Sequence, residues 1–464
     1  MKSWLFLLRD LPAKLERGIL VLILLLLASP HVDASDADAG SYPLTLSRIF
    51  PDSTLLNANY SSMYGATSYL LSDAALTDLD RQLIKQKQEL REKLGVTPFV
   101  YYWGDYLGNP VGGGEQGSTW AQLLVFGVSL HSDNYGWKGG SLVASFSDSA
   151  GNNLGTGIGN ILTPAQALSF TTFASNALYY RQLLFDDKWE FRLGRFSGAS
   201  VFASLPAMGS LPVSGAVNGT PTSLFTNLSG WHSNGKPSWA AYSKVQTTDD
   251  TFWKAAILEV NPQANNPAFH GFDMGFGPNC GSLYLTEFDW TPDFGKTGKG
   301  QDAVYPGVYM AGAYYQNYAQ PKLVGGYEWQ SYGFYLQGQQ IIWRESQVPS
   351  SKNVSLWGGV TYSPQTETAQ IPIMGYGGIY ERGLVPTRTK DITMLNYYVA
   401  GLSSQYLLPS RNPATCETVL EASHIIQVTE HFQFQPDVQW IIQPGGNPSA
   451  KSSLVIGFQV AALF

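Results

Sequence analysis

The stretch that decides the fold is SLVIGFQVAALF, which runs from Ser453 to Phe464. Every second residue in it is apolar: Leu454, Ile456, Phe458, Val460, Ala462 and Phe464. A period of two is typical of a β-strand with one apolar face. Small, polar and apolar side chains mix on the other face, which includes Ser453 and Gln459. The stretch therefore predicts a strand whose two faces meet different surroundings.

Similar segments fill the chain from Pro98 to this last strand. Segments of about ten residues, rich in aromatic and β-branched side chains, alternate with Gly-, Pro-, Asn-, Asp- and Ser-rich connections, and they number about sixteen. Connections after even-numbered segments are short, such as 186–188 and 248–250, whereas several after odd-numbered ones are long, above all 152–173 and 197–237. This sorting is typical of outer-membrane barrels. The sequence predicts an all-β fold, a transmembrane antiparallel β-barrel of about 16 strands.

The N-terminus has the pattern of a secretory signal. Basic residues precede the apolar run ILVLILLLL, from Ile19 to Leu27, and the small residues Val32 and Ala34 precede a polar stretch. This order predicts a signal peptide over residues 1–34 that is cleaved on export. A membrane anchor is the alternative, but the run is well short of the ~20 apolar residues that a spanning helix needs.

Two further regions follow the signal. Residues 35–97 are predicted to be a periplasmic lead-in with a helix at about 73–94, which Asp73 can cap and Gly95 can end. This helix is either a single amphipathic element or a short oligomerising coil. Residues 98–464 form the predicted barrel.

Composition and motifs argue against several classes of protein. The chain has 48 Gly, 26 Tyr, 13 Trp and only 14% charged residues, which is typical of neither a helical enzyme nor a disordered chain. A net charge of −7 argues against a nucleic-acid partner. The G-x-S-x-G and H-E-x-x-H motifs are absent from the sequence, and FGKTGKG, from Phe294, lacks the first glycine of a phosphate loop. The sequence predicts no cofactor, no metal site and no catalytic residue, so we do not expect an enzyme.

The two cysteines both fall at the long-loop side of the predicted barrel. Cys280 and Cys416 each lie just before an even-numbered segment. Two cysteines are too few for a disulfide scaffold or for the common four-ligand zinc sites. An oxidising compartment favours a disulfide between them, but their strands are far apart around a barrel. A disulfide and two free thiols therefore stay open as alternatives.

Alternation along the strands predicts which side chains face the lumen. In WEFRLGRF, Trp189, Phe191 and Leu193 share one face, while Glu190 and Arg192 share the other. A charge turned toward lipid costs about 2–4 kcal/mol at mid-depth, so Glu190 and Arg192 are predicted to face a wet interior. For each such charge, the alternative is a structural ion pair. The pore-lining or substrate candidates selected in this way are Trp103, Asp105, Arg181, Glu190, Arg192, Glu287, Asp289, Glu421, Asp437 and Gln439.

Four motifs resemble a known family. They are LREKLGVTPFVYYWGDYLGNPVGG from Leu90, GWKGG from Gly136, WEFRLGRFSGASVF from Trp189 and FQPDVQWIIQPGG from Phe434. In this order they resemble the OprB-like carbohydrate-selective porins, over about residues 91–464. The resemblance implies a single barrel in a Gram-negative outer membrane that passes monosaccharides and similar small polar solutes. It also implies a sugar-binding arginine, for which Arg192 is the best match and Arg181 the next.

Two parts of the chain depart from this family pattern. The lead-in from Ser35 to Glu89 is longer than a minimal barrel needs, and GLVPTRTKD, from Gly383, only loosely matches a family turn. The final strand is nevertheless expected to close the barrel against FVYYWGDYLGN, so that no edge is left unpaired.

The predicted partners follow from this assignment. They are outer-membrane lipid, sugars or small polar solutes, and the barrel-insertion machinery, because a strand ending in Phe464 resembles the signal which that machinery reads. A homotrimer is an open arrangement. Two alternatives to a porin remain. One is a barrel enzyme such as a lipid hydrolase, for which His424 would serve, and the other is a structural or adhesin barrel with a closed lumen.

Overall fold

The computed structural model describes most of the predicted barrel. It describes residues 74–167, 172–232, 236–275, 279–295, 305–345, 352–407, 415–429 and 431–463, which all belong to one compact unit, Thr45–Phe464. The predicted signal peptide, the cap residue Asp73 and the terminal Phe464 lie outside the described residues. The expectations attached to them stay predictions.

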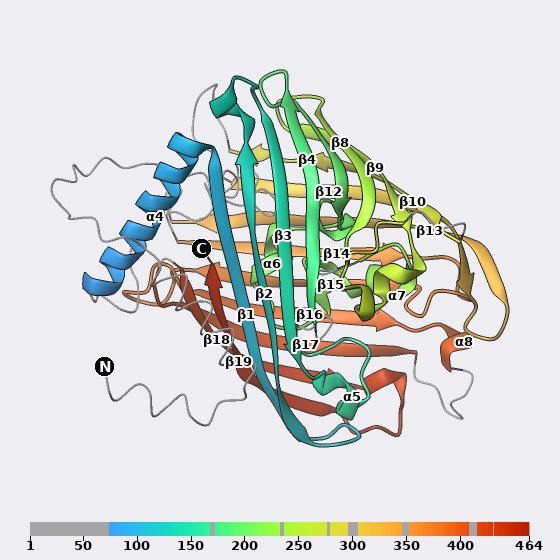
Figure 1. The fold of residues 1–464 in the computed structure, drawn as a ribbon. Helices are drawn as coiled ribbons and strands as arrows, with labels where there is room; N and C mark the ends of the chain where they lie inside the picture. Colours follow the sequence, from blue (N-terminus) through green and yellow to red (C-terminus); the bar gives the residue numbers. More distant parts are fainter. Residues whose placement is uncertain are drawn as a thin grey trace. The chain divides into compact units, whose positions relative to one another are not determined.

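Within the described residues, sixteen strands form the wall of a closed antiparallel barrel (Figure 1). They are β1 (Val96–Val111), β2 (Gly117–His131), β3 (Gly140–Gly151), β4 (Phe173–Leu184), β5 (Trp189–Phe196), β8 (Ser238–Gln246), β9 (Thr251–Val260), β10 (Gly281–Trp290), β12 (Tyr305–Pro321), β13 (Tyr327–Arg344), β14 (Asn353–Tyr362), β15 (Ile373–Arg382), β16 (Ile392–Gly401), β17 (Cys416–Gln427), β18 (Phe432–Ile442) and β19 (Ser453–Leu463). Each wall strand pairs with the next, and β1 also pairs with β19. The predicted fold class and strand number are confirmed.

Outside the wall, the described residues form the helix α4, which precedes β1, and short elements in the connections between the strands. Those described are α4 (Ala74–Leu94), η2 (Ser132–Tyr135), α5 (Leu154–Ile158), η3 (Gly198–Ser200), α6 (Pro206–Ser210), β6 (Val217–Asn218), β7 (Thr220–Pro221), α7 (Thr222–Asn227), η4 (Pro262–Asn265), η5 (Pro267–Phe269), β11 (Asp293–Phe294), α8 (Ser404–Leu407) and η6 (Pro444–Gly446). Among the described residues, we find no helix that is both long and apolar enough to cross a membrane.

The last strand closes the barrel as predicted. Trp103 of β1 lies opposite Ala461 of β19, and Asp105 lies opposite Gln459. The two faces of β19 differ in exposure: Ile456 is 47% exposed, whereas Gln459 is 3% exposed. The period of two therefore gave the inward face of Gln459 and the outward face of Ile456 correctly, whereas Ala462, on the predicted outward face, is 3% exposed.

The connections sort by length between the two ends of the barrel. The short turns 185–188, 247–250 and 428–431 lie at the end where β1 begins, which we call the short-turn end. The connections 152–172 and 197–237 lie at the opposite, long-loop end. The link from β10 to β12 is an exception, because it is long although it lies at the short-turn end.

The helix α4 is attached to the short-turn end through its last turn (Figure 1). Gly95 follows the helix at a φ of +64°, and its N–H donates to the carbonyl of Arg91 at 3.0 Å. The turn between β2 and β3 satisfies further carbonyls, because Asn134 Nδ2 donates to Glu92 O at 2.6 Å and Tyr135 Oη to Leu94 O at 3.3 Å. These bonds fix the direction in which the helix leaves the wall.

The outward face of the wall is apolar and exposed. Leu193, Leu336 and Leu395 are 55%, 59% and 59% exposed, respectively. Leu395 is flanked across the strands by Ile379 and Ala422, so its neighbours are apolar too. An apolar exterior of this kind is what a lipid bilayer requires of a barrel.

A charge introduced on this outward face should destabilise the barrel. We expect Leu395→Arg to lower the free energy of unfolding by about 2–4 kcal/mol, because a guanidinium at mid-depth loses its hydration. Urea titration in lipid vesicles, followed by the change in gel mobility on unfolding, measures the effect. Leu395→Phe is the matched apolar control and should unfold like the wild type. An arginine variant as stable as the wild type would show that this face does not meet lipid.

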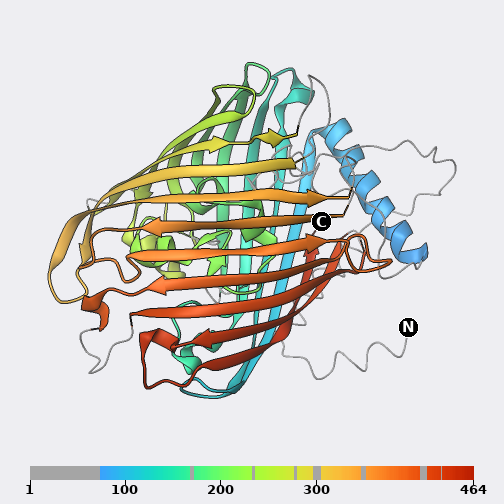
Figure 2. The ribbon, with the colours of Figure 1, turned by 180° about the vertical axis from the view of Figure 1, so that it is seen from behind.

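The interior of the barrel is filled by parts of two long connections, here called the inner loops (152–172 and 197–237). In both views, α6 and α7 lie inside the ring of strands (Figures 1 and 2). Val201, Phe202, Leu205 and Met208 of the second inner loop are each 0% exposed. They pack in two clusters with inward-facing wall residues such as Tyr335. The hydrophobic core of this protein therefore lies within the barrel, between loop and wall.

Candidate channel constriction

A buried carboxylate on β17 holds the middle of the second inner loop. Glu421 is 2% exposed, and its Oε1 accepts the backbone N–H groups of Val213 at 2.7 Å and Ser214 at 2.8 Å. Its other oxygen accepts from Asn396 Nδ2 at 2.8 Å and Tyr398 Oη at 2.6 Å. Both carboxylate oxygens of Glu421 thus accept two hydrogen bonds each. Hydrogen bonds to a charged group contribute about 1.5–3 kcal/mol each, so the two from Val213 and Ser214 hold the loop against the wall.

Three more wall carboxylates repeat this arrangement. Glu287 of β10 accepts the N–H of Ala203 at 2.7 Å. Glu417 of β17 accepts from Leu162 at 2.7 Å and from Gly445 at 2.5 Å, and so joins two connections. Asp105 of β1 accepts the N–H of Ala167 at 3.0 Å. We call Asp105, Glu287, Glu417 and Glu421 the loop clamps, because each binds the peptide backbone of an inner loop.

Wall glutamines complete the attachment of the inner loops. Gln339 and Gln316 accept the N–H groups of Ala207 and Gly230, both at 2.9 Å. Gln439 Nε2 donates to the carbonyl of Pro164 at 2.8 Å. Wall residues on several strands therefore hold both inner loops in place. The backbone of these loops occupies part of the barrel interior and so narrows the lumen.

Two groups of paired charges lie on the inner face between β4 and β10. Glu190 lies between Arg181 at 3.0 Å and Arg192 at 2.6 Å. Lys254 lies between two acids, at 2.5 Å from Glu287 and 2.7 Å from Asp289. Because these groups are removed from bulk water, each charge needs its partner close by. We call Arg181, Glu190, Arg192, Lys254, Glu287 and Asp289 the charge ladder.

The sequence-predicted candidates fall into two groups on the inner face. Arg181, Glu190, Arg192, Glu287 and Asp289 belong to the charge ladder, whereas Trp103, Asp105, Glu421, Asp437 and Gln439 lie on β1, β17 and β18. Gln439 Nε2 donates to Asp437 Oδ2 at 2.8 Å. Trp103 and Arg181 are partly exposed. The other eight are buried, with exposures of 1% (Asp105), 9% (Glu190), 3% (Arg192), 1% (Glu287), 0% (Asp289), 2% (Glu421), 1% (Asp437) and 0% (Gln439).

Glu190 and Arg192 lie on the inward face of β5 and are largely buried there. They are 9% and 3% exposed, Glu190 pairs with Arg181 and Arg192, and Arg192 also lies against the rings of Tyr179 and Tyr242. Strand alternation shows on which face a side chain lies and contains no information on what covers that face. The loop clamp Glu417 and the wall glutamine Gln339 were missed for the same reason, since their partners Leu162 and Ala207 lie far away in sequence.

One sequence signal could have revealed the inner loops. Residues 196–235 contain no Asp, Glu, Lys or Arg, and neither do residues 149–180. Loops that lie in water are usually polar, so two long connections without a charge point to burial.

The cysteines and the histidines form no catalytic or disulfide arrangement among the described residues. Cys280 and Cys416 do not form a disulfide with each other; five wall strands separate β10 from β17. His424 Nδ1 lies 2.9 Å from Thr393 Oγ1, and its Nε2 lies 3.4 Å from Asp391 Oδ2. No serine hydroxyl contacts His424 within the described part of the chain. A lipid hydrolase with a serine nucleophile therefore finds no support in this geometry.

His232 has a structural place at the end of the second inner loop. Its Nε2 lies 2.7 Å from the carbonyl of Ser229, and its Nδ1 lies 3.0 Å from Ser238 Oγ. Burial lowers the pKa of His232 to about 4, so the ring is neutral at neutral pH. No group of three or more His, Cys, Asp or Glu side chains in the described ranges is placed to hold a metal ion.

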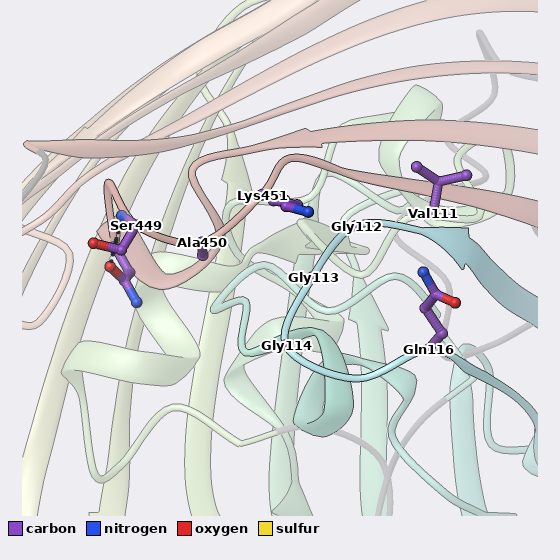
Figure 3. A pocket seen from close by; sticks show the side chains of 9 residues that line it. Val111, Gly112, Gly113, Gly114, Gln116, Ser449, Ala450 and Lys451 are labelled. Carbon is purple, nitrogen blue, oxygen red and sulfur yellow. Dashed lines mark hydrogen bonds between the residues drawn. The ribbon is translucent and has the colours of Figure 1, made fainter.

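A shallow hollow lies at the long-loop end, beside the seam between β1 and β19 (Figure 3). Its lining includes Gly112, Gly113, Gln116 and Lys451, and its volume is about 690 Å³. Gly112 has a φ of +79°, and a Cβ there would lie 1.8 Å from the carbonyl oxygen of Ser452. The N–H of Gly113 donates to Lys451 O at 2.9 Å, so the hollow marks where two loops are joined.

These features define a class of protein. A closed sixteen-strand antiparallel barrel with an apolar exterior, charged inward side chains and loops folded inside has the architecture of an outer-membrane porin. Charged groups and fixed loops within such a barrel act as a selectivity region for solutes.

Comparison with known proteins identifies the family. Residues 116–464 match the family described as carbohydrate-selective porin, OprB family, and the chain belongs to that family. It is 24% identical over 424 residues to Porin B of Pseudomonas aeruginosa, covering 82% of this chain and 89% of the relative.

Solved structures support the same fold. The high-pH structure of Pseudomonas putida OprB matches with a TM-score of 0.73 at 18% identity, covering 82% of this chain and 97% of that one. The low-pH structure of the same protein matches with a TM-score of 0.52 at 15% identity, covering 86% and 100%. The predicted family and the outer-membrane location of the barrel are confirmed.

Proposed function

We propose that this porin passes monosaccharides and similar small polar solutes by passive diffusion through a lumen narrowed by the inner loops. The observation that carries the proposal is the set of loop clamps, which fix two inner loops inside a barrel of the carbohydrate-selective family. A fixed narrow passage lined by hydrogen-bonding groups favours uncharged hydroxylated solutes over apolar ones. No chemical step is required, so the chain acts as a channel and not as an enzyme.

The inward charges contribute to the field within the passage. Arg181 and Arg192 pair with Glu190, and Lys254 pairs with Glu287 and Asp289, so each base has an acid beside it. Such paired groups form local dipoles, which orient a polar solute in the passage. Trp103 and Arg181, which are partly exposed, are the predicted candidates best placed for direct contact with a solute. Contact must stay weak, because a tightly held solute does not leave.

Liposome swelling tests this function directly. Proteoliposomes with the full-length protein should swell faster in isosmotic glucose than in an uncharged amino acid of comparable size, because sugar hydroxyls exchange hydrogen bonds with the passage. Swelling should fall steeply from mono- to oligosaccharides, since the inner loops limit the diameter. Equal rates for size-matched solutes would exclude a sugar preference while retaining the porin.

A closed structural barrel is the alternative that the same preparation excludes. A barrel with a blocked lumen gives no swelling in any solute and no step in ionic current across a planar bilayer. Discrete current steps with the full chain would establish an open channel independently of its solute preference.

A further inference from the structure

We propose that Tyr101, Trp103 and Gln433 form a saccharide-binding subsite on the short-turn side of the loop clamps. The proposal rests on the sugar-channel function proposed above and assigns a place and residues for solute contact. It places an aromatic platform on β1 opposite an amide on β18, next to the point where the inner loops end their contact with the wall.

The platform consists of stacked rings on the inward face of β1. Phe99, Tyr101 and Trp103 occupy alternate positions, with ring centroids 5.4 Å apart for the first pair and 5.9 Å apart for the second. Phe99 is 2% exposed and supports the others from the core, while Tyr101 and Trp103 are partly exposed. Rings held in this way keep one orientation, which is what the apolar C–H face of a sugar needs for stacking.

The amide side of the subsite follows from strand register. Trp103 lies opposite Ala461 of β19, Ala461 lies opposite Gln433 of β18, and Gln433 lies opposite Gln427 of β17. All four point inward. Trp103 and Gln433 are thus two strand spacings apart, roughly 10 Å between backbones. The small side chain of Ala461 leaves room between them for one pyranose ring.

Gln433 is oriented for a hydroxylated ligand. Its Nε2 donates to Gln427 Oε1 at 3.0 Å, which fixes the amide plane. Gln433 and Gln427 are both partly exposed. Among the described residues, no hydrogen bond uses Gln433 Oε1, so this oxygen is available to accept from a sugar hydroxyl. Stacking on one side and amide bonding on the other is the usual combination for polar ligands with one apolar face.

The position along the channel gives the subsite its role. The neighbouring inward row toward the long-loop end is Asp105, Gln459 and Gln435. In that row, Asp105 accepts from Ala167 at 3.0 Å and Gln435 donates to Leu211 O at 2.6 Å, so both hold inner loops. The row of Trp103 makes no such bond within the described residues. A sugar that has passed the clamped loops therefore meets Trp103 first.

Trp103→Leu and Gln433→Ala test the subsite in the full-length protein. The readout is the reduction of single-channel ionic current by glucose or maltose in a planar bilayer. We expect the half-saturating sugar concentration to rise about 2- to 10-fold in Trp103→Leu, which loses the stacking contact. Trp103→Phe should restore most of the affinity. Gln433→Ala should also bind more weakly, and it tests the same row should the tryptophan variant fail to fold.

The matched control is Tyr106→Leu, which removes an outward-facing aromatic from the same strand, 44% exposed. It should leave both the sugar effect and the current in salt alone unchanged, because its side chain does not face the passage. Wild-type affinity in Trp103→Leu, or an equal loss in Tyr106→Leu, would overturn the subsite. Sugar-driven swelling without any current reduction in the wild type overturns the subsite and leaves the proposed function intact. No sugar-driven swelling at all overturns the proposed function itself.

Discussion

Glu421→Ala is expected to give a wider and less steady channel than the wild type. The change removes the acceptor for the N–H groups of Val213 and Ser214. Two hydrogen bonds to a carboxylate contribute about 1.5–3 kcal/mol each, so the loop loses about 3–6 kcal/mol of attachment at this point. A difference of that size changes the ratio of attached to released loop by more than about 100-fold. Single-channel recording should show fluctuation between current levels, and liposomes should admit larger saccharides.

Glu421→Gln separates the loss of the acceptor from the loss of the charge. The amide keeps an oxygen where Oε1 lies and can still accept from the loop, so its current level should stay near the wild type. Leu420→Ala, on the outward face of the same strand and 43% exposed in the wild type, controls for general perturbation of β17. If Glu421→Ala keeps the wild-type current level and size limit, the clamp does not determine the diameter. Equal widening in Glu421→Gln would assign the effect to charge.

Lys254→Met should have the largest effect on stability of any single change considered for this barrel. Lys254 lies between Glu287 and Asp289, and all three side chains are at most 2% exposed. Removing the cation leaves two buried carboxylates without compensation, and breaking a buried ion pair costs about 3–5 kcal/mol. Glu287 also holds Ala203 of the second inner loop, so repulsion between the two acids should disturb that loop too. We expect a lower urea midpoint and a smaller fraction of folded barrel after refolding into lipid.

A compensating variant tests this physical reason. Lys254→Met combined with Glu287→Gln and Asp289→Asn removes all three charges while keeping side-chain volume and hydrogen-bonding oxygens. Its stability should return most of the way to the wild type, because replacing a whole buried ion group by neutral residues is often tolerated. No recovery in the triple variant would show that packing of the lysine stem, and not charge balance, accounts for the loss.

Much of the wall could be predicted from sequence because its rule is local. In WEFRLGRF, a period of two separates Leu193, 55% exposed, from Arg192, 3% exposed. The same rule gave the face of Gln459 in the last strand and the correct number of strands. The ending of α4 at Gly95 was also predictable, since only a residue that tolerates positive φ fits there easily.

The interior could not be predicted, because its contacts are not local. Glu421 and Val213 are 208 residues apart in sequence, and Glu417 and Leu162 are 255 apart. No periodicity connects such positions. The absence of charge over residues 196–235 indicates burial but does not say which wall residue meets which part of the loop. Because the sequence does not show which wall residues meet the loops, it could not show that most of the candidate solute-contact residues are buried.

The loop clamps have a consequence for engineering. They bind peptide N–H groups, which every amino acid except proline supplies. At Ala203, Val213 and Ser214, the wall carboxylates therefore bind the backbone of the inner loop and not its side chains. Val213 and Ser214 can be exchanged for residues other than proline that suit the surrounding packing, whereas Ala203, with a φ of +51°, accepts fewer replacements because bulky and β-branched residues rarely adopt this conformation. The side chains of this inner loop, which narrows the passage, can therefore be changed by mutation while the wall and its loop clamps are kept as they are.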